Sequence, residues 1–300
     1  MTATLRIGTR GSALALWQAN TVAARLAQHG RAAELIAIRT TGDRIQDRPL
    51  SEAGGKGLFV KEIEDALLAG TIDLAVHSAK DLSVAIPPGL RVAAVLPRED
   101  PRDALVLRGG LPLPADGTIG TGSVRRRAQL ALRMPGARFL PIRGNVDTRL
   151  RKLDAGEYDA IVLAVAGLTR LGLASRISEA IPFDDCIPAP GQGIIAIETR
   201  EPDAADAVWG AIGDPAAARA FVAERAVVEA LGGGCQLPLG AIAVHEGNAL
   251  VVQGIVTDAE GRRRVRRTVR GDAAQPAALG RRLAADLAEA GAIEILNSLR

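Results

Sequence analysis

Residues 5–30 read LRIGTRGSALALWQANTVAARLAQHG, and this stretch points to the fold class. Residues 5–8 have the character of a strand, and Ser12 then stands where a helix N-cap is expected. Apolar residues follow at helical spacing until Gly30 ends the pattern: Leu14, Leu16, Trp17, Val22 and Leu26. A strand that leads directly into an amphipathic helix predicts the first half of a β-α-β unit.

The residues that follow repeat the alternation. Their patterns predict a strand at 34–38, a helix at 58–69 closed by Gly70, and a strand at 72–76. A β-α-β-α-β succession is typical of an α/β layer with a parallel sheet. The eighteen residues of 40–57 form a long connection, and connections of that length are usually functional or mobile.

A second run of alternation lies between two turn-rich segments, 97–101 and 188–193, which we interpret as hinges. Inside it the patterns predict strands near 104–107, 118–120, 139–142 and 160–164, with helices beginning at Ser123, Asn145 and about Ala166. After residue 213 the pattern changes to a helix at 216–231, strands at 239–244, 249–256 and 264–269, and a helix at 277–289. This tail predicts a small α+β domain with an antiparallel sheet.

The charge balance argues against a nucleic-acid partner. The 300 residues include 37 Lys and Arg, 33 of them Arg, against 34 Asp and Glu, and the formal net charge is +3. Aromatic residues make up only 2%. Arg6 and Arg10 precede any long apolar stretch, so we expect no signal peptide, and the apolar runs are too short to span a membrane. We therefore expect a soluble cytoplasmic protein.

The positive charge is concentrated in one part of the chain. Residues 121–170 hold nine Arg and one Lys against four acidic residues, a local charge of +6. Several of these arginines stand at predicted strand-to-helix junctions, where free N–H groups and guanidinium forks bind anions. Arg10 and Ser12 repeat the arrangement near the N-terminus. The pattern predicts a polyanionic ligand between two lobes, although a solvated helix face would explain any single arginine equally well.

Three further features have both a functional and a structural interpretation. The segment 77–81, HSAKD, ends a buried strand, and Lys80 with Asp81 is either an anion-binding pair or a simple ion pair. The basic run 262–270 follows a turn, so we expect a solvated hairpin face. Of the two cysteines, Cys186 is expected to be an inert buried residue. Cys235 follows three glycines, which permit the close backbone approach that a nucleophile or a covalently held ligand requires.

Eight motifs in order along the chain give it a specific resemblance to a known family. They are RIGTRGSALALWQ (6–18), GGKGLF (54–59), HSAKD (77–81), REDPRD (98–103), GTGSVRR (120–126), RGN (143–145), PGQG (190–193) and GGCQ (233–236). With these motifs the chain resembles the hydroxymethylbilane synthase family, also called porphobilinogen deaminase. The resemblance implies a transferase of tetrapyrrole (haem) biosynthesis. Such an enzyme joins four porphobilinogen molecules with loss of ammonia and releases hydroxymethylbilane by hydrolysis.

The resemblance also implies a fold and a covalent group. We expect an α/β protein with two periplasmic-binding-protein-like lobes linked by a double crossover hinge, and a small C-terminal α+β domain with a three-stranded antiparallel sheet. Domain 1 would comprise residues 1–97 with 194–213, domain 2 residues 98–193, and domain 3 residues 214–300. A dipyrromethane cofactor would be held by a thioether to Cys235 in domain 3. No metal is implied, and we expect a monomer.

Site residues are carried over from the matching motifs. Asp81 would be catalytic, because its carboxylate can stabilise the cation left when ammonia departs. Cofactor contacts would come from Ser78, Lys80, Thr121, Ser123, Arg125, Arg126, Arg143, Gly191 and Gln192. Substrate contacts would come from Arg10, Ser12, Gln18, Arg149 and Arg170, with Lys56 and Phe59 on a lid. The main alternative is a two-lobed protein that binds a small carboxylate without catalysis.

Overall fold

The computed structural model describes residues 4–44, 57–232 and 237–299. The chain divides into two compact units, Met1–Glu99 with Ile194–Ala218 and Asp100–Gly193 with Arg219–Arg300. It therefore leaves the first unit after Glu99, inside the first predicted hinge, and returns at Ile194, directly after the second. The further division of the chain into three domains remains a prediction.

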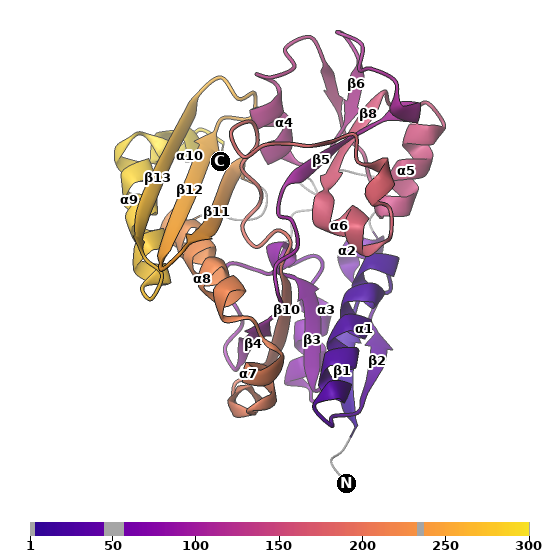
Figure 1. The fold of residues 1–300 in the computed structure, drawn as a ribbon, viewed down its shortest axis with the longest axis vertical. Helices are drawn as coiled ribbons and strands as arrows, with labels where there is room; N and C mark the ends of the chain where they lie inside the picture. Colours follow the sequence, from indigo (N-terminus) through magenta and orange to yellow (C-terminus); the bar gives the residue numbers. More distant parts are fainter. Residues whose placement is uncertain (1–3, 45–56, 233–236, 300) are drawn as a thin grey trace. The chain divides into compact units, whose positions relative to one another are not determined.

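The first unit contains a five-stranded sheet in the order β2-β1-β3-β10-β4 (Figure 1). Its strands are β1 (Leu5–Thr9), β2 (Ala33–Ala37), β3 (Leu74–Ser78), β4 (Leu90–Val95) and β10 (Ile195–Arg200). β1 is parallel to β2 and β3, which confirms the predicted parallel β-α-β-α-β layer. β10 is antiparallel to both of its neighbours. The sequence patterns did not predict β4 and β10.

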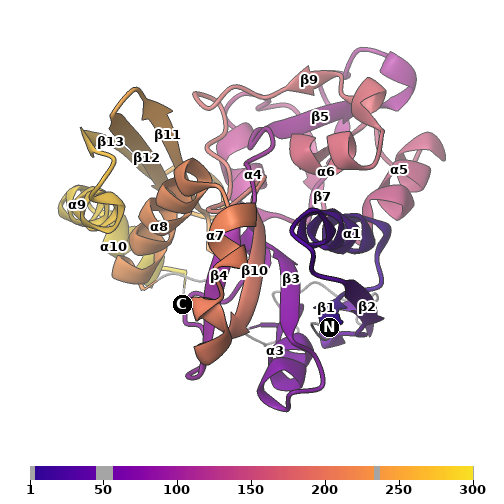
Figure 2. The same cartoon turned by 60° about the horizontal axis from the view of Figure 1, so that its bottom comes forward.

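Helices cover both faces of this sheet. They are α1 (Ala13–Gln28), α2 (Thr41–Arg44), α3 (Lys61–Leu68) and α7 (Val208–Ile212), with the 3₁₀ helices η1 (Ala79–Asp81) and η4 (Pro202–Ala205). α1 packs on one face and α3 on the other (Figure 2). The helix predicted at 58–69 begins only at Lys61, because residues 57–60 form a turn in which Val60 N–H donates to Gly57.

The second unit repeats this strand order. Its five-stranded sheet runs β7-β6-β8-β5-β9. The strands are β5 (Asp103–Leu107), β6 (Thr118–Gly120), β7 (Arg138–Leu140), β8 (Ala160–Ala164) and β9 (Glu179–Ala180). β6 is parallel to β7 and β8, and β5 takes the antiparallel place that β10 has in the first sheet. The helices are α4 (Val124–Leu130), α5 (Val146–Asp154) and α6 (Val165–Arg170), with η2 (Arg108–Gly110) and η3 (Ala174–Arg176).

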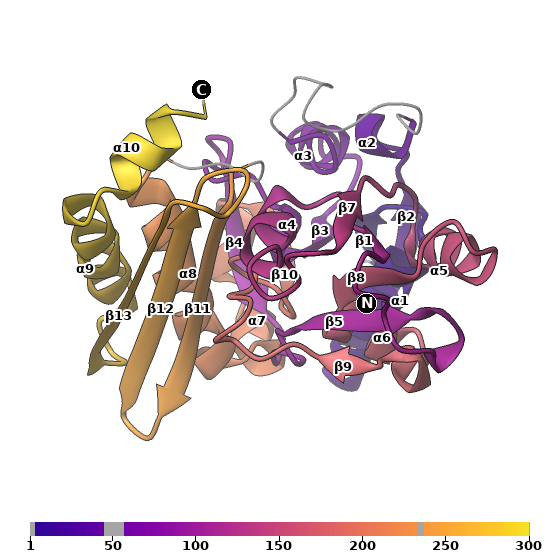
Figure 3. The same cartoon turned by 90° about the horizontal axis from the view of Figure 1, so that it is seen from above.

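The C-terminal part forms a three-stranded antiparallel sheet, β11-β12-β13 (Figure 3). Its strands are β11 (Leu239–Glu246), β12 (Ala249–Thr257) and β13 (Arg264–Asp272). The helices α8 (Pro215–Ala230), α9 (Pro276–Glu289) and α10 (Ala292–Asn297) pack against it around one apolar core. Two α/β sheets of matching order and one small antiparallel sheet confirm the predicted fold class. No helix within the described residues has the length and apolar character needed to cross a membrane.

Candidate functional site

Two strand ends of the first unit carry the first group of predicted site residues. β1 and β3 run in parallel, with Gly8 opposite Ala75. Their carboxyl ends therefore meet at one sheet edge, which is where α/β proteins bind ligands. Arg10 and Ser12 directly follow β1, and residues 78–81 end β3 and form η1. The fold thus places these predicted residues along a common edge.

Hydrogen bonds fix α1 against the end of β3. Ser12 Oγ caps the helix by accepting from a backbone N–H of the first turn at 3.3 Å. Gln18 is buried, and its Nε2 lies 2.9 Å from Ser78 Oγ. Lys80 and Asp81 follow in η1, both partly exposed. The structure therefore brings Gln18 and Ser78 into contact and places Asp81 one short turn beyond them.

Arg10 is paired with a carboxylate and an aromatic ring. Its Nη2 lies 2.5 Å from Asp43 Oδ1, and its guanidinium carbon lies 4.2 Å from the centre of the Phe59 ring. Burial acts to raise the pKa of Asp43, but hydrogen bonds from Arg10 and Thr40 hold that pKa below its usual value. Phe59, predicted as part of a lid, is thus a direct neighbour of Arg10.

The second unit has an equivalent edge. β6 is parallel to β7 and β8, so three carboxyl ends meet there. Thr121 and Ser123 follow β6, and Arg143 follows β7. β5 runs in the opposite direction, and its first residue, Asp103, lies opposite Ala164, the last residue of β8. This edge therefore also holds a carboxylate to which the sequence analysis assigned no role.

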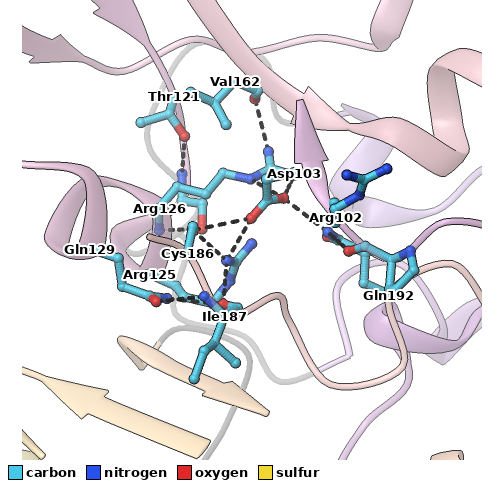
Figure 4. A network of polar contacts seen from close by, with 12 residues as sticks. Arg102, Asp103, Thr121, Arg125, Arg126, Gln129, Val162, Cys186, Ile187 and Gln192 are labelled. Atoms are coloured by element: carbon cyan, nitrogen blue, oxygen red, sulfur yellow. Dashed lines mark hydrogen bonds and ion pairs between the residues drawn. The ribbon is translucent and has the colours of Figure 1, made fainter. Parts of the chain in front are cut away.

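Asp103 is fully buried and gathers four side chains (Figure 4). Its Oδ2 accepts a hydrogen bond from Arg125 Nη1 at 2.7 Å and lies 3.3 Å from Cys186 Sγ. Its Oδ1 accepts from Arg126 Nη2 at 2.7 Å and from Gln192 Nε2 at 2.9 Å. The structure thus brings three predicted cofactor-binding residues together around one internal carboxylate.

The two arginines of this cluster are internal rather than open to solvent. Arg125 is 5% exposed and Arg126 is 6% exposed. Arg125 also donates to the carbonyl of Ile187 at 2.8 Å, and Arg126 to that of Val162 at 2.9 Å. Burial alone would raise the pKa of Asp103, but the two guanidinium charges bring it far below its ordinary value. We expected the guanidinium groups of Arg125 and Arg126, at the start of α4, to face a ligand. In this structure they bind internal partners instead.

The second predicted hinge is held on several sides. Gly191 N–H donates to Glu224 Oε2 at 2.6 Å, which ties the hinge to α8. Arg170 Nη2 donates to the carbonyl of Gly193 at 2.6 Å, which ties it to α6. Gly191 and Gln192 are both buried. These predicted site residues therefore shape the hinge as well as the edge beside it.

The remaining predicted residues of this unit lie along the same edge. Thr121 Oγ1 accepts from the N–H of Ser123 at 3.2 Å, which fixes the turn before α4. Arg149 Nε donates to the carbonyl of Gly144 at 2.8 Å. Burial lowers the pKa of Arg143, a guanidinium that is partly withdrawn from solvent. This edge of the sheet thus carries both hydroxyl groups and guanidinium groups.

This set of donors fits a group that carries several carboxylates. Cations and hydroxyls make up the edge, and the buried carboxylate of Asp103 is matched by two arginines. Guanidinium forks and hydroxyls are the partners that carboxylates prefer. A dipyrromethane with acidic side chains would suit Thr121, Ser123 and Arg143. Lys56 and Cys235, also predicted to act here, lie outside the described residues.

One structural expectation about the arginines is wrong in part. We expected the basic run 262–270 to form a solvated hairpin face. Arg266 is only partly exposed, and its Nη2 lies 2.9 Å from Asp184 Oδ1 and 3.0 Å from Gln253 Oε1. Arg266 therefore joins β13 to the segment before the second hinge, a tertiary contact that a local sequence pattern does not reveal.

Sequence reasoning also missed a buried acidic group in the first unit. His77 Nε2 lies 3.1 Å from Glu198 Oε2, and both side chains are almost fully buried. Glu64, on α3, is 6% exposed, and burial and the charge of Glu198 raise its pKa to about 7. A signal existed for His77, which belongs to the quoted motif 77–81. Its partner Glu198 lies on β10, far away in the sequence, so the pattern alone could not find this pair.

Comparisons with solved structures give low similarity. The chain is similar to a periplasmic substrate-binding protein of an ABC transporter from Coxiella burnetii, with 13% identity over 72% of this chain and 94% of that chain, and a TM-score of 0.42. It is also similar to the periplasmic sulfonate-binding protein SsuA from Methylobacillus flagellatus KT, with 14% identity over 74% and 67% of the two chains and a TM-score of 0.41. The fold class stated above rests on the sheets themselves.

Comparisons with sequence families are far stronger. Residues 5–207 match the family model described as "Porphobilinogen deaminase, dipyromethane cofactor binding domain", and residues 218–289 match "Porphobilinogen deaminase, C-terminal domain". The porphobilinogen deaminase of Methylobacillus flagellatus is 48% identical over 99% of this chain and 97% of its own length. That of Roseiflexus castenholzii is 49% identical over 97% and 98%. The chain belongs to the porphobilinogen deaminase family.

Proposed function

We propose that this protein is a hydroxymethylbilane synthase, which condenses four porphobilinogen molecules with loss of ammonia and releases the linear tetrapyrrole by hydrolysis. Family membership over nearly the whole chain supports this enzyme over the non-catalytic carboxylate-binding alternative. The observation in the structure that supports it most is the shared edge of β1 and β3, where Asp81 follows one strand and Arg10 the other.

Asp81 is the residue to which we assign catalysis. Loss of ammonia leaves positive charge on the pyrrole of the substrate, and a fixed carboxylate stabilises charge that develops in the transition state. η1 holds Asp81 directly after β3, and the contact between Ser78 and Gln18 anchors that strand end to α1. A positioned carboxylate avoids the cost of reorganising solvent during the reaction.

The cationic and hydroxyl side chains would bind the acetate and propionate groups of the pyrroles. Arg10, Ser12 and Lys80 would act from the first unit, and Ser123, Arg143, Arg149 and Arg170 from the second. A dipyrromethane attached to Cys235 would supply a covalent primer, which makes each extension step effectively intramolecular. Contacts of Arg125 and Arg126 with this primer would require the guanidinium groups to share or exchange their present partners. That the enzyme acts as a cytoplasmic monomer also remains our prediction.

The test is Asp81→Asn, with the exposed Asp65→Asn as the matched control. We expect both variants to carry an intact-mass excess of two linked pyrrole units, and Cys235→Ser to lack it. Ammonia release by Asp81→Asn should fall by roughly 10²–10³-fold, while Asp65→Asn keeps the wild-type rate. Near-normal turnover in Asp81→Asn would move the catalytic role elsewhere. The bare polypeptide mass in active, freshly made protein would contradict the cofactor assignment.

A further inference from the structure

The guanidinium of Arg10 is fixed on one edge and one face. Asp43 Oδ1 accepts from its Nε at 3.1 Å and from its Nη2 at 2.5 Å, so the carboxylate occupies the side edge of the fork. The ring of Phe59 lies 4.2 Å from the guanidinium carbon and covers one face. Both side chains of the ion pair are 20% exposed, so the pair is largely shielded from water.

Asp43 reaches this place because of the sheet. β2 is parallel to β1, with Ala37 opposite Thr9, so the chain after β2 emerges beside Arg10. Thr40 then holds the carboxylate of Asp43 through its hydroxyl at 2.8 Å and its backbone N–H at 3.3 Å. Asp43 is therefore itself positioned, with its charge directed at Arg10.

Phe59 is held by the same short segment. The N–H of Gly42 donates to the carbonyl of Leu58 at 2.7 Å. A Cβ on residue 42 would lie only 2.3 Å from the Phe59 ring, so glycine is required for this close packing. Thr41 adds a second tie, because its backbone N–H donates to Glu62 Oε1 at 2.8 Å. The aromatic face under Arg10 is thus built into the fold.

Within the part of the chain that the structure describes, one edge of the Arg10 guanidinium remains available. Among the described residues, Nη1 of Arg10 has no hydrogen-bond partner, and the guanidinium presents its Nη1 and outer Nη2 protons on that side. Two parallel N–H groups of this kind bind a carboxylate in bidentate fashion. We propose that Asp43, supported by Phe59, is a positioning residue that orients Arg10 to receive a carboxylate of the pyrrole substrate.

This inference rests on the proposed function, in which Arg10 binds substrate. Without Asp43 the long Arg10 side chain regains its rotamer freedom, and each binding event must order it again. We therefore expect substrate binding to weaken and the rate of the chemical step to stay nearly unchanged. Removing uniform binding raises KM and leaves kcat nearly unchanged.

The experiment measures ammonia release against porphobilinogen concentration for Asp43→Asn in the full enzyme loaded with cofactor. We expect KM to rise about tenfold, with kcat within about twofold of wild type. The control is Asp65→Asn, which removes the exposed pair with Lys61 on α3 and should keep the wild-type KM.

A double-mutant cycle with Arg10→Gln separates positioning from a general structural effect. If Asp43 acts through Arg10, Asp43→Asn should raise KM in the wild-type background and have no further effect in Arg10→Gln. An equal rise in both backgrounds, or a fall in KM for Asp43→Asn, would overturn the positioning role. If Arg10→Gln raises KM but Asp43→Asn does not, this inference fails alone. If Arg10→Gln leaves KM unchanged, the proposed substrate contact of Arg10 fails with it.

Discussion

At the scale of single residues, Asp103 holds the second unit together by charge. Its carboxylate is fully buried between Arg125 and Arg126, so Asp103→Asn leaves two buried guanidinium groups without a matching charge. We expect the free energy of unfolding to fall by about 3–5 kcal/mol. Urea denaturation measures this loss. Glu246→Gln breaks the exposed pair with Arg270 in the same unit and should cost no more than about 1 kcal/mol. Equal losses of unfolding free energy in the two variants would contradict the role of Asp103 as the counter-charge of the buried arginines.

Glu64 predicts a pH dependence of stability. Burial and the charge of Glu198 raise its pKa to about 7, while its unfolded value is near 4.5. A raised pKa means that the folded state binds the proton more tightly, so this contribution is full below pH 4.5 and is lost as pH rises through 7. Glu64→Gln keeps a neutral group, so its stability relative to wild type should be more favourable at pH 8 than at pH 5. The measurement is the urea midpoint of both proteins at pH 5 and pH 8. Midpoints that change by the same amount in wild type and Glu64→Gln between the two pH values would contradict the prediction.

At the scale of elements, α8 joins two segments through one buried side chain. Glu224 Oε2 accepts from Gly191 N–H at 2.6 Å and Oε1 from Ala243 N–H at 2.8 Å. A glutamine offers only one oxygen, so Glu224→Gln leaves a buried N–H facing another donor. We expect a loss of about 1–3 kcal/mol and faster amide hydrogen exchange at Gly191 or Ala243. Glu229→Gln, on the exposed side of the same helix, is the control and should change neither.

The local sequence patterns predicted most helices and strands, and they missed those that depend on partners far away in the sequence. α1 was predictable because Ser12 caps it and its buried positions recur at helical spacing. β10 was not predicted, because it pairs with β3 and β4 more than a hundred residues earlier in the sequence. The start of α3 was placed too early, since residues 57–60 continue the apolar pattern but form a turn.

At the scale of the whole molecule, sheet topology explains why much of the site could be anticipated. Parallel strands deliver the residues after them to a common edge, so the segments after β1, β3, β6 and β7 could be proposed as site segments from sequence order. The carboxylates that pair with the arginines could not be anticipated in this way. Asp103 reaches Arg126 only because β5 runs against β8, and Asp43 reaches Arg10 only because β2 lies beside β1. Charge pairing across strands depends on register, which local pattern does not specify.

The whole chain contains two cysteine residues, Cys186 and Cys235. Burial raises the pKa of Cys186 to about 12, so this thiol stays protonated and should not react in the folded enzyme. Cys235 would be blocked by its thioether. We therefore expect no iodoacetamide label in native enzyme and one label after denaturation, measured by intact mass. Cys186→Ala should take none when denatured. Two labels on the denatured wild type would show that Cys235 carries a free thiol and would contradict covalent attachment there.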